Sequence, residues 1–168
     1  MPEDEVIERA HKDAEEGKSP SSQAGEFVRE EMHHIREGKH GARSPQQAIA
    51  IGLSKARRAG VDLKAPQSGK ATNRVREQAQ RDLKKGKSAS HRPVSKVRSR
   101  ATANALKREG HSAASPGSLS QQGHRAARKR GKRSRQNSAR RAVKTKGPAG
   151  LRAAGRKAAR TRASHGSS

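Results

Sequence analysis

The chain has 168 residues, of which 40 are Lys or Arg and 15 are Asp or Glu, so its formal net charge is +25. It contains no Cys, Trp or Tyr, and Phe27 is its one Phe, which excludes disulfide scaffolds, thiol nucleophiles and Cys-based zinc sites. Large apolar residues are too few for one large core, no apolar run approaches the ~20 residues of a membrane span, and the acidic start does not resemble a signal peptide. We therefore expect a protein with no membrane association, in the cytoplasm where it is made.

The charge is distributed unevenly along the chain. Residues 1–37 carry 11 acidic and 5 basic side chains, a net charge of −6. Residues 38–110 carry 19 basic and 4 acidic side chains, a net of +15, and residues 111–168 carry 16 basic side chains and no acidic one. Within the acidic part, residues 1–18 predict an N-terminal helix with few apolar side chains to bury.

A helical module is predicted over residues 19–63, because the large apolar residues are concentrated there. Its first helix is expected to begin at Ser19-Pro20, an N-cap residue followed by proline in the first turn. Apolar side chains including Phe27 then form one stripe, and Gly38 can take the left-handed position that ends the helix.

The second helix of the module is expected to begin at Ser44-Pro45, with Gln47 completing a capping box. Gly60 is placed to end it. Two amphipathic helices joined by a short turn predict a helical hairpin.

Residues 64–110 are predicted to form basic weak helices and linkers. One narrow apolar stripe covers 75–83 and stops before Gly86, and another begins at Val94 and stops before Gly110. Both glycines are interpreted as C′ residues.

Residues 111–168 consist mainly of Ala, Gly, Ser, Arg and Lys. Like-charge repulsion and the absence of an apolar face predict a disordered cationic tail. The predicted fold class is therefore mostly α with a large disordered fraction: a small helical hairpin module, flanking weak helices and a basic disordered tail.

The histidines and carboxylates form no recognisable reactive motif. His33, His34 and His40 are the densest group of histidines, and the carboxylates at positions 30, 31 and 37 would complete only a loose metal site. Adjacent helical side chains point about 100° apart, so His33 and His34 cannot chelate one ion together, and no HExxH spacing is present. Solvated or phosphate-facing histidines are favoured. We predict no metal, no cofactor, no small-molecule substrate and no enzymatic activity.

Polyanion binding is the chemistry that remains. Arginine forks contact phosphates in a bidentate way, and the near absence of aromatic residues disfavours the stacking platforms that bind single strands. The sequence thus predicts contacts to the phosphate backbone, most readily of duplex DNA. The expected nucleic-acid-binding residues are Lys55, Arg57 and Arg58 in the module and, in the tail, Arg125, Arg128, Lys129, Arg130, Lys132, Arg133, Arg135, Arg140, Arg141, Lys144, Lys146, Arg152, Arg156, Lys157, Arg160 and Arg162.

Residues 44–60, SPQQAIAIGLSKARRAG, together with the segments 26–31 and 38–41, resemble a family of small basic bacterial proteins of uncharacterised function. The resemblance covers roughly residues 20–70. It implies a bacterial cytoplasmic protein, of a kind sometimes described as DNA-binding or histone H1-like, and it supplies no catalytic residues. The tail is similar to histone H1 tails in composition only.

The predicted function is that of a nucleoid-associated, histone H1-like protein that binds DNA without sequence specificity by neutralising phosphates. Two alternatives remain open on the sequence. One is an RNA- or ribosome-binding basic protein, and the other is a stress-protective disordered protein.

Overall fold

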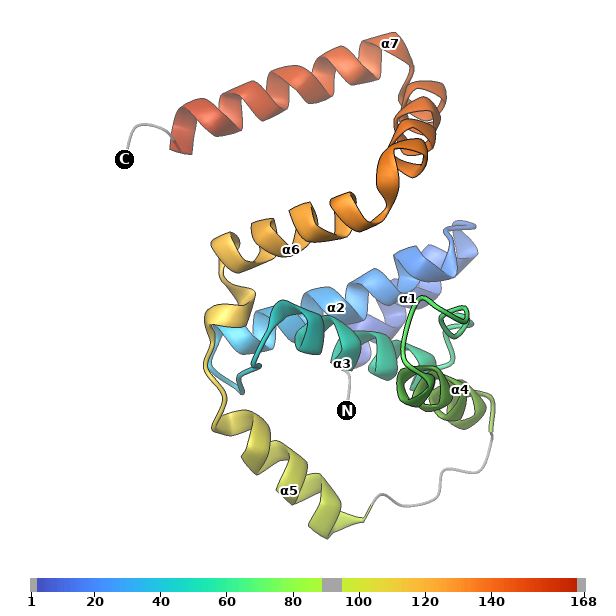
Figure 1. Cartoon of the computed structure of the whole chain (residues 1–168), viewed down its shortest axis with the longest axis vertical. Coiled ribbons are helices and arrows are strands. Elements are labelled where there is room, and N and C mark those ends of the chain that lie inside the picture. Colours follow the sequence, from blue (N-terminus) through green and yellow to red (C-terminus); the bar gives the residue numbers. More distant parts are fainter. Residues whose placement is uncertain (1–2, 89–94, 166–168) are drawn as a thin grey trace. The chain divides into compact units, whose positions relative to one another are not determined.

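The computed structural model describes residues 3–88 and 95–165, and every element within these ranges is a helix (Figure 1). The elements are α1 (Asp4–Glu15), α2 (Pro20–Arg36), α3 (Pro45–Arg58), α4 (Asn73–Lys87), α5 (Lys96–Lys107), the short 3-10 helix η1 (Ser112–Ala114), α6 (Pro116–Lys129) and α7 (Gly131–His165). The chain divides into two units, residues 1–122 and 123–168. The predicted helical character is confirmed.

The start and end of α2 follow the local rules. Ser19 occupies the N-cap position in an extended conformation, Pro20 is the first helical residue, and Gly38 has a positive φ of 75° just after the helix. The Ser19 hydroxyl makes no hydrogen bond to the helix backbone. Proline in the first turn therefore marks this start more directly than the cap side chain does.

The start and end of α3 also agree with the sequence. Ser44 Oγ accepts a hydrogen bond from the Gln47 backbone N at 3.2 Å. At the other end Gly60 has a φ of 97°, and the Val61 backbone N donates to the Ala56 carbonyl at 3.1 Å. These contacts satisfy backbone groups that a helix end leaves unpaired.

Two small apolar clusters form the core of the first unit, and α2 contributes to both. The first cluster consists of Val6, Ala10, Ala24, Phe27, Ala56 and Val61, and the second of Met32, Ile35, Ala42, Ala48, Ala113 and Ala114. Seven of these twelve buried residues are alanines. Helices that meet through alanine approach closely, which is how a chain with few large apolar residues still builds a core.

The packed module extends beyond the predicted residues 19–63 at both ends. The acidic helix α1 buries Val6 and Ala10 against the first cluster. On the other side, η1 places Ala113 and Ala114 in the second cluster. A third Ser-Pro pair follows: Ser115 Oγ accepts from the Ser118 backbone N at 3.2 Å where α6 begins.

Two glycines allow helices to pack at very short range. A Cβ on Gly52 of α3 would lie 2.7 Å from the Val28 Cα of α2. A Cβ on Gly86 would lie 2.0 Å from the Arg57 carbonyl oxygen.

Gly86 and Gly110 have no positive φ, and α4 runs through Gly86 to Lys87, so the interpretation of both as C′ residues is wrong. Val94, where the second predicted stripe begins, lies outside the described residues.

The predictions of a large disordered fraction and of a disordered tail are wrong. Residues 112–165 are built from η1, α6 and α7, and the structure is 78% helical. The prediction of disorder rested on the lack of apolar residues that could form a core. A single helix needs no core for its backbone hydrogen bonds, because they form within the segment. Ala, Arg and Lys are also among the residues with the highest helix propensity. α7 is interrupted at Gly147, which has a φ of 63° and a ψ of 175°, and Pro148 opens its second part.

Candidate nucleic-acid interface

Lys55 is engaged within the first unit. Its Nζ lies 2.7 Å from Glu31 Oε2 and 3.4 Å from Glu30 Oε2 on the neighbouring helix α2. Both carboxylates are buried. This ammonium neutralises acids of α2, so it is not available to a phosphate.

Arg57 and Arg58 also have partners inside the fold. The Arg57 guanidinium is buried and donates to the carbonyl oxygens of Leu63 at 3.0 Å and Leu53 at 3.4 Å. Burial lowers the pKa of Arg57 from its ordinary value, and the charge of Asp82 acts in the opposite direction. Arg58 Nε lies 2.8 Å from Asp82 Oδ1. The structure thus gives all three module cations expected at the interface internal roles.

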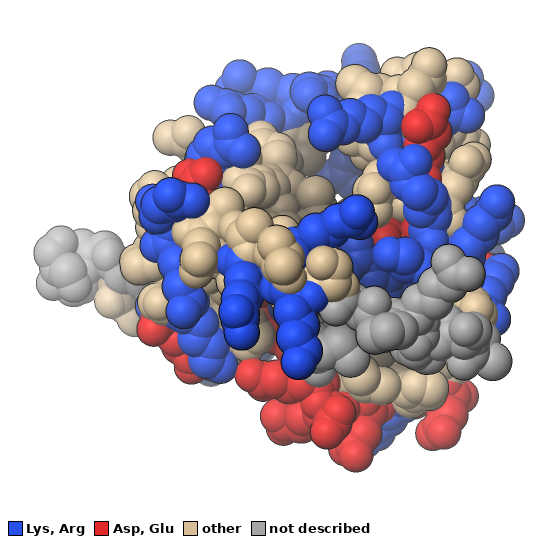
Figure 2. Space-filling view, turned by 90° about the horizontal axis from the view of Figure 1, so that it is seen from below, with Lys and Arg blue, Asp and Glu red and all other residues tan. Residues whose placement is uncertain are grey.

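The sixteen predicted tail cations have a different environment. All lie between residues 125 and 162 on α6, α7 and the turn between them, and each is exposed. None forms an ion pair with a carboxylate in the described part of the chain, and residues 111–168 themselves contain no Asp or Glu. Figure 2 shows that Lys and Arg side chains reach the surface over much of the visible face, and that Asp and Glu side chains reach it in several places.

The second part of α7 arranges its cations in a row. Arg152, Arg156 and Arg160 recur every four residues, which places them on one face at steps of about 6 Å along the axis. Ala149 and Ala153 lie beside them in a shallow hollow. A row of guanidinium groups over small side chains presents donors that a phosphate backbone can contact without steric hindrance.

Four further cations were absent from the predicted set. Lys96, Arg98, Arg100 and Lys107 of α5 are exposed and form no ion pair with the described residues, and α5 buries no residue. In the sequence, the net charge of +15 over residues 38–110 indicated that this part of the chain carries unpaired basic side chains. These four side chains are a second candidate set of phosphate contacts within the first unit, separate from the tail cations.

The histidines differ from the expectation of solvated side chains. His33 is exposed and pairs with Glu37 at 3.1 Å. His34 and His40, by contrast, are largely buried and face one another, with ring centroids 6.1 Å apart. The carboxylate of Glu3 lies 3.0 Å from His34 Nε2, and hydrogen bonds from His34 and Lys39 lower the pKa of Glu3.

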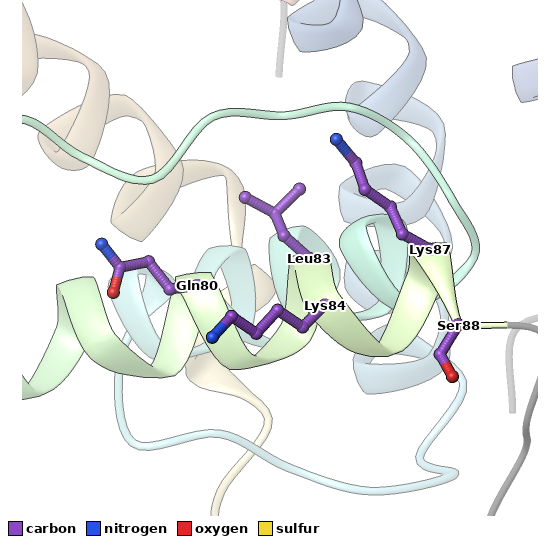
Figure 3. A pocket seen from close by; sticks show the side chains of 5 residues that line it. All are labelled: Gln80, Leu83, Lys84, Lys87 and Ser88. Carbon is purple, nitrogen blue, oxygen red and sulfur yellow. The ribbon is translucent and has the colours of Figure 1, made fainter.

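A hollow along the C-terminal half of α4 is lined by Gln80, Leu83, Lys84, Lys87 and Ser88 (Figure 3). All five residues belong to one helix and its C-cap, and Lys87 Nζ pairs with Asp62 at 3.0 Å. Binding cavities combine polar groups from several elements, so we assign this hollow no small-molecule ligand.

Among the described residues, no helix has the length and apolar character that crossing a bilayer requires. Searches of protein-family models, curated proteins and solved structures find nothing that matches this chain. The resemblance of residues 44–60 to a family of basic bacterial proteins therefore stays a prediction.

Proposed function

We propose that the protein binds duplex DNA without sequence specificity, as a nucleoid-associated protein with no catalytic role. The observation that carries the proposal is the exposure of sixteen tail cations that have no carboxylate partner among the described residues. A protein that neutralises phosphates with Lys and Arg releases condensed counterions, and this release supplies most of the free energy of non-specific binding.

The helical form of the tail supports DNA over double-stranded RNA. An α-helix with its side chains is about 10–12 Å wide, and the major groove of B-DNA is about 12 Å wide. The major groove of A-form RNA is too narrow for a helix to enter. Each part of α7, residues 131–146 and 148–165, extends more than about 20 Å along its axis, enough to follow a groove.

The composition of the interface supports low sequence specificity. Arg and Lys contacts to phosphate oxygens position a protein on a duplex but carry no base information. The tail is poor in Asn and Gln, whose side chains read adenine edges in the major groove. Affinity should therefore depend on salt far more than on sequence.

A gel-shift titration against salt tests the proposal. If roughly ten phosphates are engaged, log K falls with log salt at a slope near −9. A slope shallower than about −3 contradicts backbone binding by the tail.

Two full-length variants locate the contacts. The tail variant replaces Arg152, Arg156, Lys157, Arg160 and Arg162 with Gln. The control replaces five exposed cations of the first unit, Lys64, Lys70, Arg74, Lys84 and Lys85, with Gln. Each lost phosphate contact makes the slope of log K against log salt shallower by about 0.9. We therefore expect the slope of the tail variant to be shallower by about 4, and that of the control by less than about 1. Equal losses would reject the assignment to the tail.

Competition between duplex DNA and a structured RNA at about 150 mM salt tests which of the two polyanions the protein binds. We expect the DNA complex to persist at equal phosphate concentration. Transfer of the protein to the RNA would reject duplex DNA as the partner.

A further inference from the structure

A group of acidic and imidazole side chains lies where α1, α2 and the turn after α2 meet. Glu31 and His34 are three residues apart on α2, and His40 reaches them from the turn. One ligand atom from each of these three residues lies within 4.8 Å of the other two. The Glu31 side chain is 1% exposed, that of His34 11% and that of His40 17%.

The hydrogen bond of His40 to the backbone determines which of its nitrogens faces the group. His40 Nδ1 lies 3.2 Å from the Gly41 carbonyl oxygen, which can only accept, so Nδ1 carries a proton. His40 Nε2 then faces Glu31 Oε1 at 3.2 Å. In a neutral imidazole this nitrogen would direct its lone pair at a carboxylate oxygen, which is repulsive. A cation between them removes the repulsion, and that cation is either a second proton on His40 or a metal ion.

Glu31 provides an independent observation. It is fully buried, and neither of its carboxylate oxygens accepts an aligned hydrogen bond from the described residues. Lys55 Nζ lies near Oε2, which leaves the lone pairs of Oε1 facing the histidines. Lys55 compensates the Oε2 side of this buried carboxylate, so a second cation would be bound from the Oε1 side, where the histidines lie.

The surroundings match those of metal-binding histidines. Such histidines typically donate the ring N–H that does not bind the metal to a backbone carbonyl or a carboxylate, as His40 does toward Gly41. Glu3 Oε1 lies 3.0 Å from His34 Nε2, and the Glu3 side chain is half exposed. Glu3 therefore offers a further carboxylate on the exposed side of the group.

The charges of the group also favour a divalent ion. When both histidines are neutral, the carboxylates of Glu3, Glu30 and Glu31 are balanced by the ammonium groups of Lys55 and Lys39, and Lys39 is also shared with the exposed Glu37. One negative charge is then left in a largely buried site. A divalent cation converts it to one positive charge, close to neutrality and without any added proton.

We propose that Glu31, His34 and His40 form a structural site for a divalent transition metal of the zinc type, with Glu3 or water as the fourth ligand. Two imidazoles and a carboxylate suit Zn²⁺, which accepts nitrogen and oxygen donors in a tetrahedron. Zn–ligand bonds of about 2.1 Å give a tetrahedral edge of about 3.4 Å, which is close to the 3.2 Å between His40 Nε2 and Glu31 Oε1. The bound ion would join the turn after α2 to the start of α1.

Calorimetric titration of the full chain with Zn²⁺ at about pH 7 tests this site. The variants are His40→Gln and Glu31→Gln, and the control is His33→Gln. His33 is the neighbour of His34 on the same helix, but its side chain is 68% exposed and lies outside the group. We expect the wild-type chain and His33→Gln to bind one ion with a Kd at or below about 1 μM, and the two site variants to bind at least about 100-fold more weakly.

Two results would overturn the proposal. One is wild-type affinity weaker than about 100 μM, and the other is equal affinity in His40→Gln and His33→Gln. Either would mean that the geometry reflects an imidazolium–carboxylate pair alone. Should a site variant fail to fold, X-ray absorption of the wild-type zinc complex decides: two imidazole ligands support the site, and an all-oxygen shell rejects it. The readouts involve no nucleic acid, so they are independent of DNA binding.

Discussion

Arg58 on α3 and Asp82 on α4 form an ion pair between a half-exposed guanidinium and a buried carboxylate, with Arg58 Nε 2.8 Å from Asp82 Oδ1. The Asp82 side chain is 1% exposed and also accepts from Ser54 Oγ at 2.7 Å and Gln78 Nε2 at 3.1 Å. α4 buries only Ala79 besides this aspartate, so these polar contacts, together with the close approach of Gly86 to the Arg57 carbonyl, attach it to α3. A helix with a narrow apolar stripe is thereby held in place.

Replacing Asp82 with Asn should destabilise the first unit by about 2 kcal/mol, because hydrogen bonds to a charged acceptor are lost while the neutral side chain stays buried. The midpoint of urea unfolding measures this. The matched control is Glu77→Gln on the same helix, whose carboxylate is exposed and lies 3.8 Å from Arg81. We expect Glu77→Gln to lower the free energy of unfolding by less than about 0.5 kcal/mol. Equal effects of the two substitutions would show that the Asp82 contacts do not support α4.

Replacing Gly52 with Ala should destabilise the contact between α2 and α3 by about 2 kcal/mol. The added methyl group would meet the Val28 Cα at 2.7 Å, which forces the helix backbones apart. Gly25 on α2 is the control, because a Cβ there has no neighbour within 4 Å. Gly25→Ala should stabilise the protein by roughly 0.5–1 kcal/mol through helix propensity. Thermal unfolding of the two variants should therefore shift in opposite directions.

Hydrogen exchange should separate helices that are packed from helices that are only locally stable. α2 buries seven residues, whereas no residue of α7 is buried in the part of that helix whose exposure is described. We expect amides of α2 to exchange at least about 100-fold more slowly than those of α7, since α7 can open without disturbing a core. Similar protection in both helices would mean that α7 has packing partners of its own.

The acidic first helix is expected to weaken DNA binding at low salt through its charge. Deleting residues 1–18 is not a clean test, because it removes Val6 and Ala10 from the core. Glu8 and Glu15 are exposed and form no ion pair with the described residues, so Glu8→Gln with Glu15→Gln changes charge alone. We expect binding to tighten about 2- to 3-fold at about 50 mM salt and to be unchanged near 300 mM, where screening is strong. Unchanged affinity at low salt would contradict this competition.

The residues of the proposed metal site show what the sequence could not predict about their side chains. His34 and His40 are visible as histidines, and the i, i+3 spacing of Glu31 and His34 is visible too. The direction of His40 is set by the turn after α2 and by its bond to the Gly41 carbonyl. Neither follows from spacing along the chain, so the sequence favoured solvated side chains.

A similar limit applied to the basic patch expected on the module. Lys55 and Arg58 look free in the sequence because their partners are about 25 residues away. Their ion pairs exist only because α3 packs against α2 on one side and against α4 on the other.

The sequence by itself determined the helix limits of the module and the distribution of charge. Ser44, Gln47 and Gly60 act within a few residues of their own position, and net charge is a sum that folding does not change. A third Ser-Pro pair, at 115–116, likewise lies where α6 begins. Only the tertiary structure decided which charges are neutralised inside the fold and which remain exposed. Burial and pairing depend on contacts between distant segments, whereas capping and propensity act locally.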